Sequence, residues 1–250
     1  MLMRGYIDES YDDKVFSWCC ILSTRSQWMG LEKAWKRCIA SENRRLKKLG
    51  RPQISRYHAS DCSSLHGEFE GWSTEEQVSL VKQLFAILKN YSTYTVAWDV
   101  KLADILAVYP DARRDPLDAC YSLLTKFMLQ VTGRDFEGSK VTLFHDRTNG
   151  YDETILRAFN QMLRDPNFPY RASFSTIAPL SWEDCIALQP ADLVAYEIFK
   201  RGSGRKRKSF EKLINLQSFG IRYKTLPLDI LLKIKQDTEM RGRSVKPLAE

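Results

Sequence analysis

The sequence predicts an α/β fold in which helices cover a mixed β-sheet. Strand-forming residues in Gly5–Ile7 and Val15–Leu22 flank the polar stretch Asp8–Lys14, a pattern typical of an antiparallel hairpin. Beyond the hairpin, strand-like segments alternate with helical ones, which is the order expected of a sheet with helices on its faces. With 250 residues and 44% hydrophobic composition, we expect one domain over residues 1–240 and a polar tail at 241–250.

The segment after the hairpin predicts a long helix and then a short strand. The helix begins near Ser26, carries an apolar stripe on one face, and ends before Gly50. Its opposite face carries many cations, which is typical of a solvated surface as well as of a surface that binds polyanions. Ile54–His58 is predicted to be a short strand, and Ala59–Trp72 is predicted to be a loop.

Cap and turn residues mark the elements that follow. Ser73 and Glu76 form a capping box at the start of a second helix, and Asp115-Pro116 begins a third helix that Gly133 closes. The remaining predicted elements are strands at Tyr94–Val100 and Val141–Phe144, an extended segment at Tyr170–Ile177, and helices at Thr154–Leu163, from about Pro190, and at Leu228–Lys235.

Charge and cysteine usage limit the partners and the compartment. The net charge of +7 favours a polyanionic partner such as nucleic acid, because Lys and Arg bound to phosphates release counterions. The six cysteines form no C-x-x-C pair, which predicts reduced, mostly buried thiols in place of a zinc ribbon or a disulfide framework. No apolar run has the length needed to cross a bilayer and no signal peptide is visible, so we expect a cytoplasmic protein with no membrane partner.

Three acidic sites lie at the ends of predicted strands or at the start of a helix. Asp8-Glu9 and Asp146 each follow an apolar strand, and Asp192 lies in the first turn of the helix that Pro190 begins. Burying a lone carboxylate is costly unless it is paired or binds a metal. Each acid also has a structural interpretation, as a turn residue that bonds its own backbone or as an acid that stabilises a helix N-terminus.

Carboxylates from three separate elements are suited to hold divalent cations. Mg²⁺ prefers carboxylate and water oxygens, and two such ions about 3.5–4 Å apart activate a water and stabilise the leaving oxygen of a phosphodiester. An acidic centre in a basic chain fits this chemistry, because the metals need anions while the substrate needs surrounding cations. The pattern thus indicates two Mg²⁺ or Mn²⁺ ions and a nucleic-acid partner, either DNA or RNA.

Four features of the sequence point to a known family. They are Tyr6-Ile7-Asp8-Glu9-Ser10, a mid-chain His58, Asp146 after a strand, and Leu188-Gln189-Pro190-Ala191-Asp192-Leu193-Val194-Ala195. In this combination the chain resembles the bacterial domain-of-unknown-function family numbered 3800, which is grouped with the RNase H-like (integrase-like) superfamily. The resemblance covers residues from about 4 to about 200, and the last motif is its most specific part.

The resemblance implies an RNase H-like mixed sheet and a metal-dependent nuclease or strand-transfer enzyme. In that superfamily the first acid lies on the first strand, another follows a later strand, and the last lies on a helix, which implies Asp8, Asp146 and Asp192 as the metal ligands. The chain departs from the family at Tyr11, where Gly is usual, and at Pro190, where an aliphatic residue is usual. Proline is tolerated at a first helical position, so the motif stays intact.

Further residues are candidates for roles around the three acids. His58 is a candidate metal ligand or a group that assists the leaving oxygen, against the alternative of a surface or strand-end histidine. Gln189 would orient a ligand or satisfy backbone groups at the helix start. The candidates for a fourth acid are Glu9, Glu183 and Asp184. His66 and His145 are interpreted as structural. Asp61 and Asp99 are backup acids, against the alternative that each is a cap or turn residue.

A basic stretch directly after the predicted Asp192 helix is a candidate contact with a phosphate backbone. Its cations are Arg201, Arg205, Lys206, Arg207 and Lys208. The alternative is a solvated surface loop.

Two other functions stay open at this stage. A chain of the same fold that only binds nucleic acid, or serves as an adaptor, would bind with steep salt dependence and cleave nothing. A PIN-domain nuclease also gathers acids but is built around a parallel sheet, so antiparallel pairing of the first two strands would argue against it. The chain contains no G-x-x-x-x-G-K-[ST] phosphate loop, so no nucleotide cofactor is expected.

Overall fold

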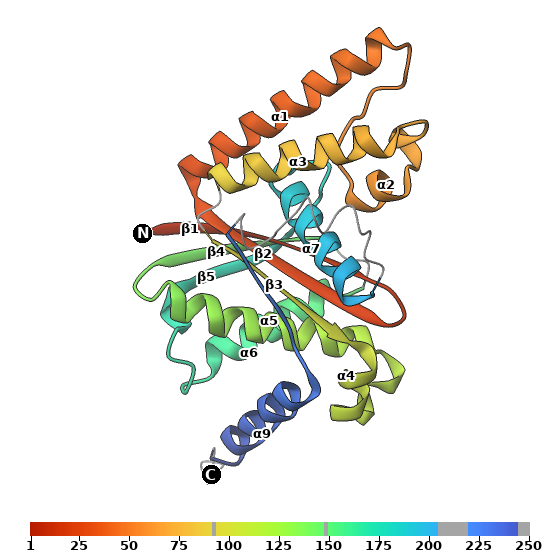
Figure 1. Ribbon diagram of the computed structural model, residues 1–250. Helices are drawn as coiled ribbons and strands as arrows, with labels where there is room; N and C mark the ends of the chain where they lie inside the picture. Colours follow the sequence, from red (N-terminus) through yellow and green to blue (C-terminus); the bar gives the residue numbers. More distant parts are fainter. Residues whose placement is uncertain (92–93, 148–149, 205–219, 245–250) are drawn as a thin grey trace.

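The structure, a computed structural model, describes residues 1–91, 94–147, 150–204 and 220–244 and shows an α/β fold around one mixed sheet (Figure 1). The strands are β1 (Leu2–Tyr11), β2 (Val15–Thr24), β3 (Tyr94–Lys101), β4 (Lys140–Asp146), β5 (Phe174–Leu180) and β6 (Ile221–Thr225). They lie in the order β5-β4-β1-β2-β3-β6. β2 runs antiparallel to both β1 and β3, whereas the other neighbouring strands are parallel.

Helices cover both faces of the sheet (Figure 1). One face packs against α1 (Arg25–Lys48), α2 (Ala59–Ser64), α3 (Thr74–Tyr91) and α7 (Gln189–Gly202). The opposite face packs against α4 (Leu102–Val108), α5 (Pro116–Asp135), α6 (Asp152–Arg164) and α9 (Leu228–Ser244). Short 3₁₀ turns occur at Gly67–Phe69, Pro110–Arg114, Arg171–Ser173 and Ile186–Leu188.

The alternation of side chains along β1 decides which helical layer each residue meets. Tyr6 belongs to the hydrophobic cluster of the α7 face, and Ile7 belongs to the cluster of the α5 face. The same alternation directs Asp8 to the α7 face and Glu9 to the α5 face. The two adjacent acids of the sequence therefore face different layers of the protein.

Several predictions from the sequence are confirmed. β1 and β2 pair antiparallel, and the Asp115 side chain caps α5, whose first residue is Pro116. Pro190 lies in the first turn of α7. All six cysteines are free thiols and most are buried. In the described part of the chain, no helix combines the length and the apolar composition that crossing a bilayer requires.

Four local predictions are wrong. The first strand does not end before Asp8, because β1 continues to Tyr11 and pairs with β2 along that length, so only residues 12–14 connect the two strands. Ile54–His58 is not a strand, because the Asn43 side chain satisfies both backbone groups of Ile54: its Nδ2 donates to the carbonyl oxygen at 2.7 Å and its Oδ1 accepts from the N–H at 2.8 Å. Ala59–Trp72 is not a plain loop, since it contains α2 and a 3₁₀ turn. Gly133 does not close α5 but lies inside it, where an added Cβ would come within 2.4 Å of the Tyr170 Cβ.

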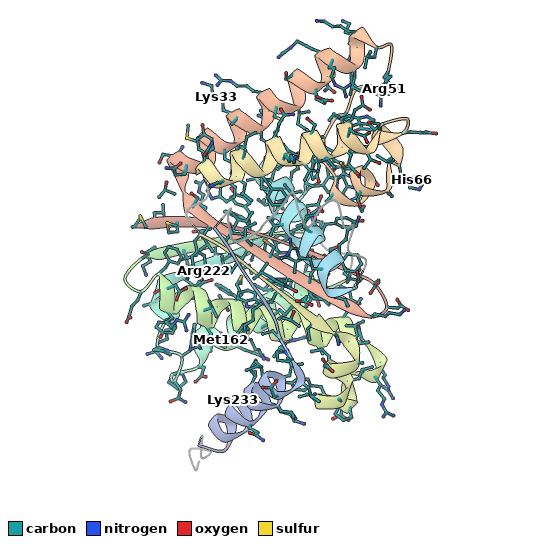
Figure 2. All side chains as sticks on the ribbon, viewed as in Figure 1. Lys33, Arg51, His66, Met162, Arg222 and Lys233 are labelled. Carbon is teal, nitrogen blue, oxygen red and sulfur yellow. The ribbon has the colours of Figure 1, made fainter. Side chains whose placement is uncertain are left out.

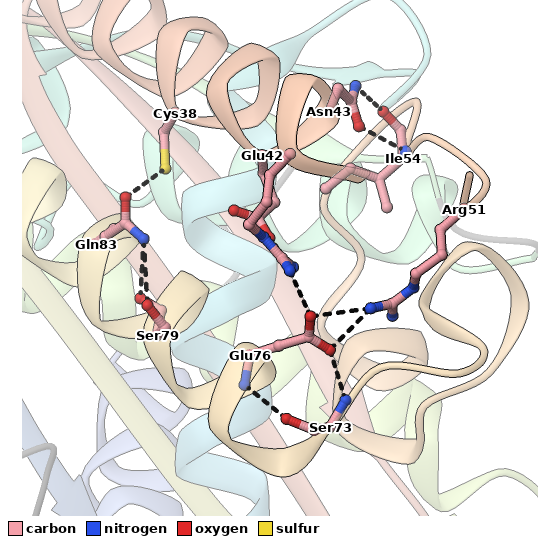
Figure 3. A network of polar contacts seen from close by, with 10 residues as sticks. Cys38, Glu42, Asn43, Arg51, Ile54, Ser73, Glu76, Ser79 and Gln83 are labelled. Carbon is pink, nitrogen blue, oxygen red and sulfur yellow. Dashed lines mark hydrogen bonds and ion pairs between the residues drawn. The ribbon is translucent and has the colours of Figure 1, made fainter. Parts of the chain in front are cut away.

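Glu76 lies where α1, α3 and the chain that follows α1 meet (Figure 3). Its Oε2 accepts the Ser73 N–H at 2.7 Å and the Ser73 Oγ accepts the Glu76 N–H at 3.3 Å, which is the predicted capping box. Its Oε1 also accepts from Arg51 Nη1 at 2.9 Å. Burial raises the pKa of Glu76, but the Ser73 N–H and the Arg45 and Arg51 guanidiniums outweigh burial and lower it to about 2.

We predict that Glu76→Gln lowers the free energy of unfolding at pH 7 by about 1–2 kcal/mol, because it weakens the cap and removes both ion pairs. The folded-state pKa lies below the ordinary value of 4.5, so the stabilisation is present above that pH and is lost as pH falls toward about 2. Urea denaturation at pH 7 and at pH 3 should therefore show a smaller difference between wild type and variant at the lower pH. Glu70→Gln, at an exposed position, is the control, and a difference that does not shrink in acid would contradict the prediction.

Candidate functional site

Asp8 and Asp146 lie on neighbouring parallel strands. The last rung of the β1–β4 ladder joins Ile7 to His145, so the two acids that follow these residues are neighbours as well. Both acids point to the α7 face, where the aromatic rings two positions earlier on each strand stack with centroids 5.3 Å apart. The parallel register thus brings together acids that are far apart in the sequence.

Asp192 reaches the same face of the sheet from the first turn of α7. This helix packs across β1, β2 and β3, and the Ser17 Oγ of β2 donates to the Ala195 carbonyl at 2.9 Å. The charge of Asp192 raises the pKa of Asp8, and the charge of Asp146 raises the pKa of Asp192. The three predicted acids therefore lie within electrostatic range of one another.

Burial and mutual repulsion shift the pKa values of all three carboxyl groups upward. The pKa of Asp8, which is 8% exposed, is raised well above its ordinary value by burial first and then by the charges of the neighbouring acids. Burial raises the pKa of Asp192 to about 6, although nearby cations and a backbone N–H oppose the shift. Burial also raises the pKa of Asp146. A group of buried, mutually repelling acids is typical of functional sites, because structure alone gains nothing from it.

Backbone N–H groups hold each carboxylate in place. The donors are Glu9 to Asp8 Oδ1 at 2.7 Å, Ala59 to Asp192 Oδ2 at 2.8 Å, and Arg147 to Asp146 Oδ1 at 3.0 Å. The Trp182 backbone N–H also lowers the pKa of Asp146. These bonds orient the carboxylates and oppose part of the upward pKa shift.

Glu9 is held on the opposite side of the sheet. Its Oε1 accepts the hydroxyl of Tyr121 on α5 at 2.7 Å, and the Tyr121 ring packs edge-on against Phe16 and Trp18. Burial raises the pKa of Glu9 to about 8, although the Tyr121 hydroxyl opposes the shift. Glu9 acts on Asp8 through its charge, and its assignment as a fourth acid stays a prediction.

The chain between α1 and α2 brings two basic residues to the acids. Arg56 and His58 both lower the pKa values of Asp146 and Asp192. His58 Nδ1 lies 2.8 Å from Oδ2 of Asp61, which is in the first turn of α2. Asp61 therefore orients the His58 ring beside the carboxylates.

Gln189 links the segment that contains Arg56 and His58 to the start of α7 by a hydrogen bond. Its Oε1 accepts two hydrogen bonds, from the Trp35 Nε1 of α1 at 2.9 Å and from the Tyr57 N–H at 3.1 Å. Tyr57 is buried and lies between Arg56 and His58 in the sequence. Gln189 thus positions Arg56 and His58 relative to Asp192, which lies three residues further along α7.

The remaining residues named in the sequence analysis occupy exposed turns or buried positions with partners of their own. Glu183 and Asp184 are exposed on the turn after β5, where Glu183 Oε2 accepts the Ser181 hydroxyl at 3.1 Å. His66 is exposed, and Figure 2 labels it at the edge of the α2 region. His145 is 2% exposed, and burial lowers its pKa. Asp99 is buried on β3 and accepts the Tyr223 hydroxyl of β6 at 2.6 Å.

The predicted basic stretch is described only at its start. Arg201 is half-buried near the end of α7, and its charge lowers the pKa of Tyr223. Arg205, Lys206, Arg207 and Lys208 lie outside the described residues.

Sequence reasoning missed Arg56 and Trp182 as residues beside the acids. The available signal was that polar Arg56 and His58 flank the aromatic Tyr57, which is buried. Trp182 carried no such signal.

The described residues define an α/β protein with a partly buried acidic site formed by Asp8 within β1, Asp146 at the end of the parallel strand β4, and Asp192 in the first turn of α7. No family model matches the chain, and no curated protein matches it. The resemblance described above therefore stays a prediction from the quoted motifs.

We predict that Asp8→Asn raises the thermal unfolding midpoint in metal-free buffer at pH 8 by about 2–4 °C, because it removes a buried charge from a cluster of like charges. The pKa of Asp8 in the folded protein lies above its ordinary value of 3.8, so stability falls as pH rises from that ordinary value toward the raised pKa. Scanning calorimetry between pH 5 and pH 8 should therefore show a gain that grows with pH. Asp13→Asn, at an exposed position, is the matched control, and an equal effect of both variants at every pH would contradict the prediction.

Proposed function

We propose that the chain is a metal-dependent phosphodiester hydrolase or strand-transfer enzyme of the RNase H-like class. The observation that carries the proposal is the convergence of Asp8, Asp146 and Asp192 on one face of the sheet, with pKa values raised by burial and by one another's charges. The acids come from a first strand, a later strand and a helix, in the order that the family resemblance implies.

The strand arrangement supports this class over a PIN-domain nuclease. β1 and β2 form an antiparallel pair, as do β2 and β3, and the strands β4 and β5 that follow are parallel to β1. A PIN domain is built around a parallel sheet, so the early antiparallel strands favour the RNase H-like alternative.

The donor atoms of the site fit Mg²⁺ or Mn²⁺. Carboxylate oxygens are the ligands these ions prefer, and a divalent cation would relieve the repulsion that raises the pKa of Asp8. In the described part of the chain, no three His, Cys, Asp or Glu side chains are already grouped closely enough to hold an ion.

When bound, such ions supply an activated water and stabilise the leaving oxygen of a phosphodiester. The chain's own residues would orient the reacting groups, exchange a proton and offset negative charge. The carboxylates hold their positions through backbone N–H bonds, and His58, whose ring Asp61 orients, would exchange a proton with the departing oxygen. Arg56 adds positive charge beside Asp146 and Asp192.

The charge of the molecule supports a nucleic-acid partner. A cationic stripe follows the outer side of α1, opposite the residues that face the core, and Figure 2 labels Lys33 within it. Its exposed members are Lys33, Lys36, Arg37, Arg44, Lys47 and Lys48. Together with the net charge of +7, this surface is suited to phosphate backbones without reading base sequence.

We predict that Asp8→Asn, Asp146→Asn and Asp192→Asn each lower Mg²⁺- or Mn²⁺-dependent cleavage by about 10³-fold or more, because each removes a charged metal ligand. The measurement is gel analysis of labelled single- and double-stranded DNA and RNA, with EDTA as the metal-free reference. Asp13→Asn should keep wild-type activity. Folding is checked by circular dichroism, and full activity in a folded Asp8 or Asp192 variant would sink the assignment.

The same assay separates the enzyme from the binding or adaptor alternative. A wild-type protein that binds these nucleic acids with steep salt dependence, but cleaves none of them with either metal, would favour the alternative. Anomalous diffraction from Mn²⁺-soaked crystals gives an independent result, because the proposal requires manganese between Asp8, Asp146 and Asp192.

A further inference from the structure

Arg56 is held on an aromatic ring beside the acids. Its Cζ lies 3.3 Å from the centroid of the Trp182 ring, a close cation–π stack. Within the described residues Arg56 forms no ion pair and no hydrogen bond, whereas Arg45 and Arg51 both pair with Glu76. Stacking occupies the flat face of the guanidinium and leaves the N–H donors on its rim for another partner.

The fold fixes both members of this stack next to the carboxylates. Arg56 precedes Tyr57, whose N–H is bound by Gln189 at 3.1 Å, and it follows the segment that Asn43 holds at Ile54. Trp182 closely follows Leu180, whose carbonyl accepts the Arg147 N–H at 2.9 Å beside Asp146, and the Trp182 backbone N–H lowers the pKa of Asp146. The guanidinium is therefore positioned from two separate parts of the chain, and its place does not depend on a bound partner.

Arg56 lies beside the acids, where a positive charge would favour the approach of an anion. A phosphodiester that approaches Asp8, Asp146 and Asp192 meets like charges, and a fixed cation offsets that repulsion. The positive charge of Arg56 acts on both Asp146 and Asp192. A planar guanidinium also matches two phosphate oxygens at once, which a lysine ammonium does not.

We propose that Arg56, stacked on Trp182, is the residue that binds the substrate phosphate beside the acids. The inference rests on the proposed function for the class of substrate, a phosphodiester of DNA or RNA. It assigns to Arg56 a direct contact with two non-bridging phosphate oxygens, and to Trp182 the role of the platform that positions the guanidinium.

The test is binding, measured by fluorescence anisotropy in Ca²⁺ buffer so that turnover is not needed. Labelled DNA and RNA oligonucleotides are compared with a DNA oligonucleotide whose linkages are neutral methylphosphonates. For whichever natural backbone the wild type binds, Arg56→Ala should raise the Kd about tenfold and reduce the slope of log K against log salt by about one. Arg56→Lys should show a smaller loss, because it keeps the charge without the planar fork. Methylphosphonate DNA should bind wild type and Arg56→Ala equally.

Arg222→Ala is the matched control. Arg222 also stacks on an aromatic ring, with Cζ 4.8 Å from the centroid of Tyr94, but it lies on β6, separated from β1 by β2 and β3. Figure 2 labels this residue on the strand. Its removal should leave the Kd unchanged. Trp182→Ala should weaken binding in the same direction as Arg56→Ala, and the double variant should lose little more than either single one.

Three outcomes would overturn the inference. They are an unchanged Kd in folded Arg56→Ala, an equal loss on natural and methylphosphonate DNA, and no measurable binding of either natural backbone by the wild type. A protein that cleaves nothing yet shows the charge-dependent Arg56 effect would refute the enzyme proposal and leave this inference standing. Normal cleavage by wild type with no effect of Arg56→Ala would refute this inference alone.

Discussion

The parallel pairing of β1 with β4 is the constraint on which the acidic site depends. Its register places Asp8 and Asp146 beside each other and turns both toward α7. Because side chains alternate along a strand, a slip of one residue would move Asp146 to the α5 face and separate the two carboxylates. The apolar residues of β4 enforce the register, since Val141 and Leu143 must meet the core on the α5 side.

Two hydrophobic layers offset the cost of burying these acids. The α7 face packs Trp28 and Trp35 of α1 against the sheet, and the opposite face packs Trp18 and Tyr121. Each side chain of this size contributes several kcal/mol by leaving water, whereas buried carboxylates lower stability unless they gain partners. The large aromatic core therefore allows the protein to retain a site that is unfavourable for folding.

Much of the fold and part of the site could be predicted from the sequence, and the limits have physical causes. Strand ends and helix starts are local signals, so Asp146 and Asp192 could be placed on their elements, whereas Asp8 was expected after the first strand and lies inside β1. The position of Arg56 depends on hydrogen bonds that Ile54 and Tyr57 make with Asn43 and Gln189. These partners are not neighbours in the sequence, so the local residue pattern wrongly predicted a strand at Ile54–His58. The short elements α4 and β6 were not predicted, because few residues provide little periodic signal.

The division of Asp8 and Glu9 between the two faces links the site to both layers of the molecule. The Glu9 N–H donates to Asp8 Oδ1 at 2.7 Å, while the Glu9 carboxylate accepts from Tyr121 in the α5 layer at 2.7 Å. A displacement of α5 would move Tyr121, and with it the backbone that orients Asp8. The charge of Glu9 also acts electrostatically on Asp8, on the other face of the sheet, and raises its pKa. The adjacent acids thus have separate roles. Asp8 faces Asp146 and Asp192 on the α7 side of the sheet, and Glu9 anchors the backbone next to Asp8 from the α5 side.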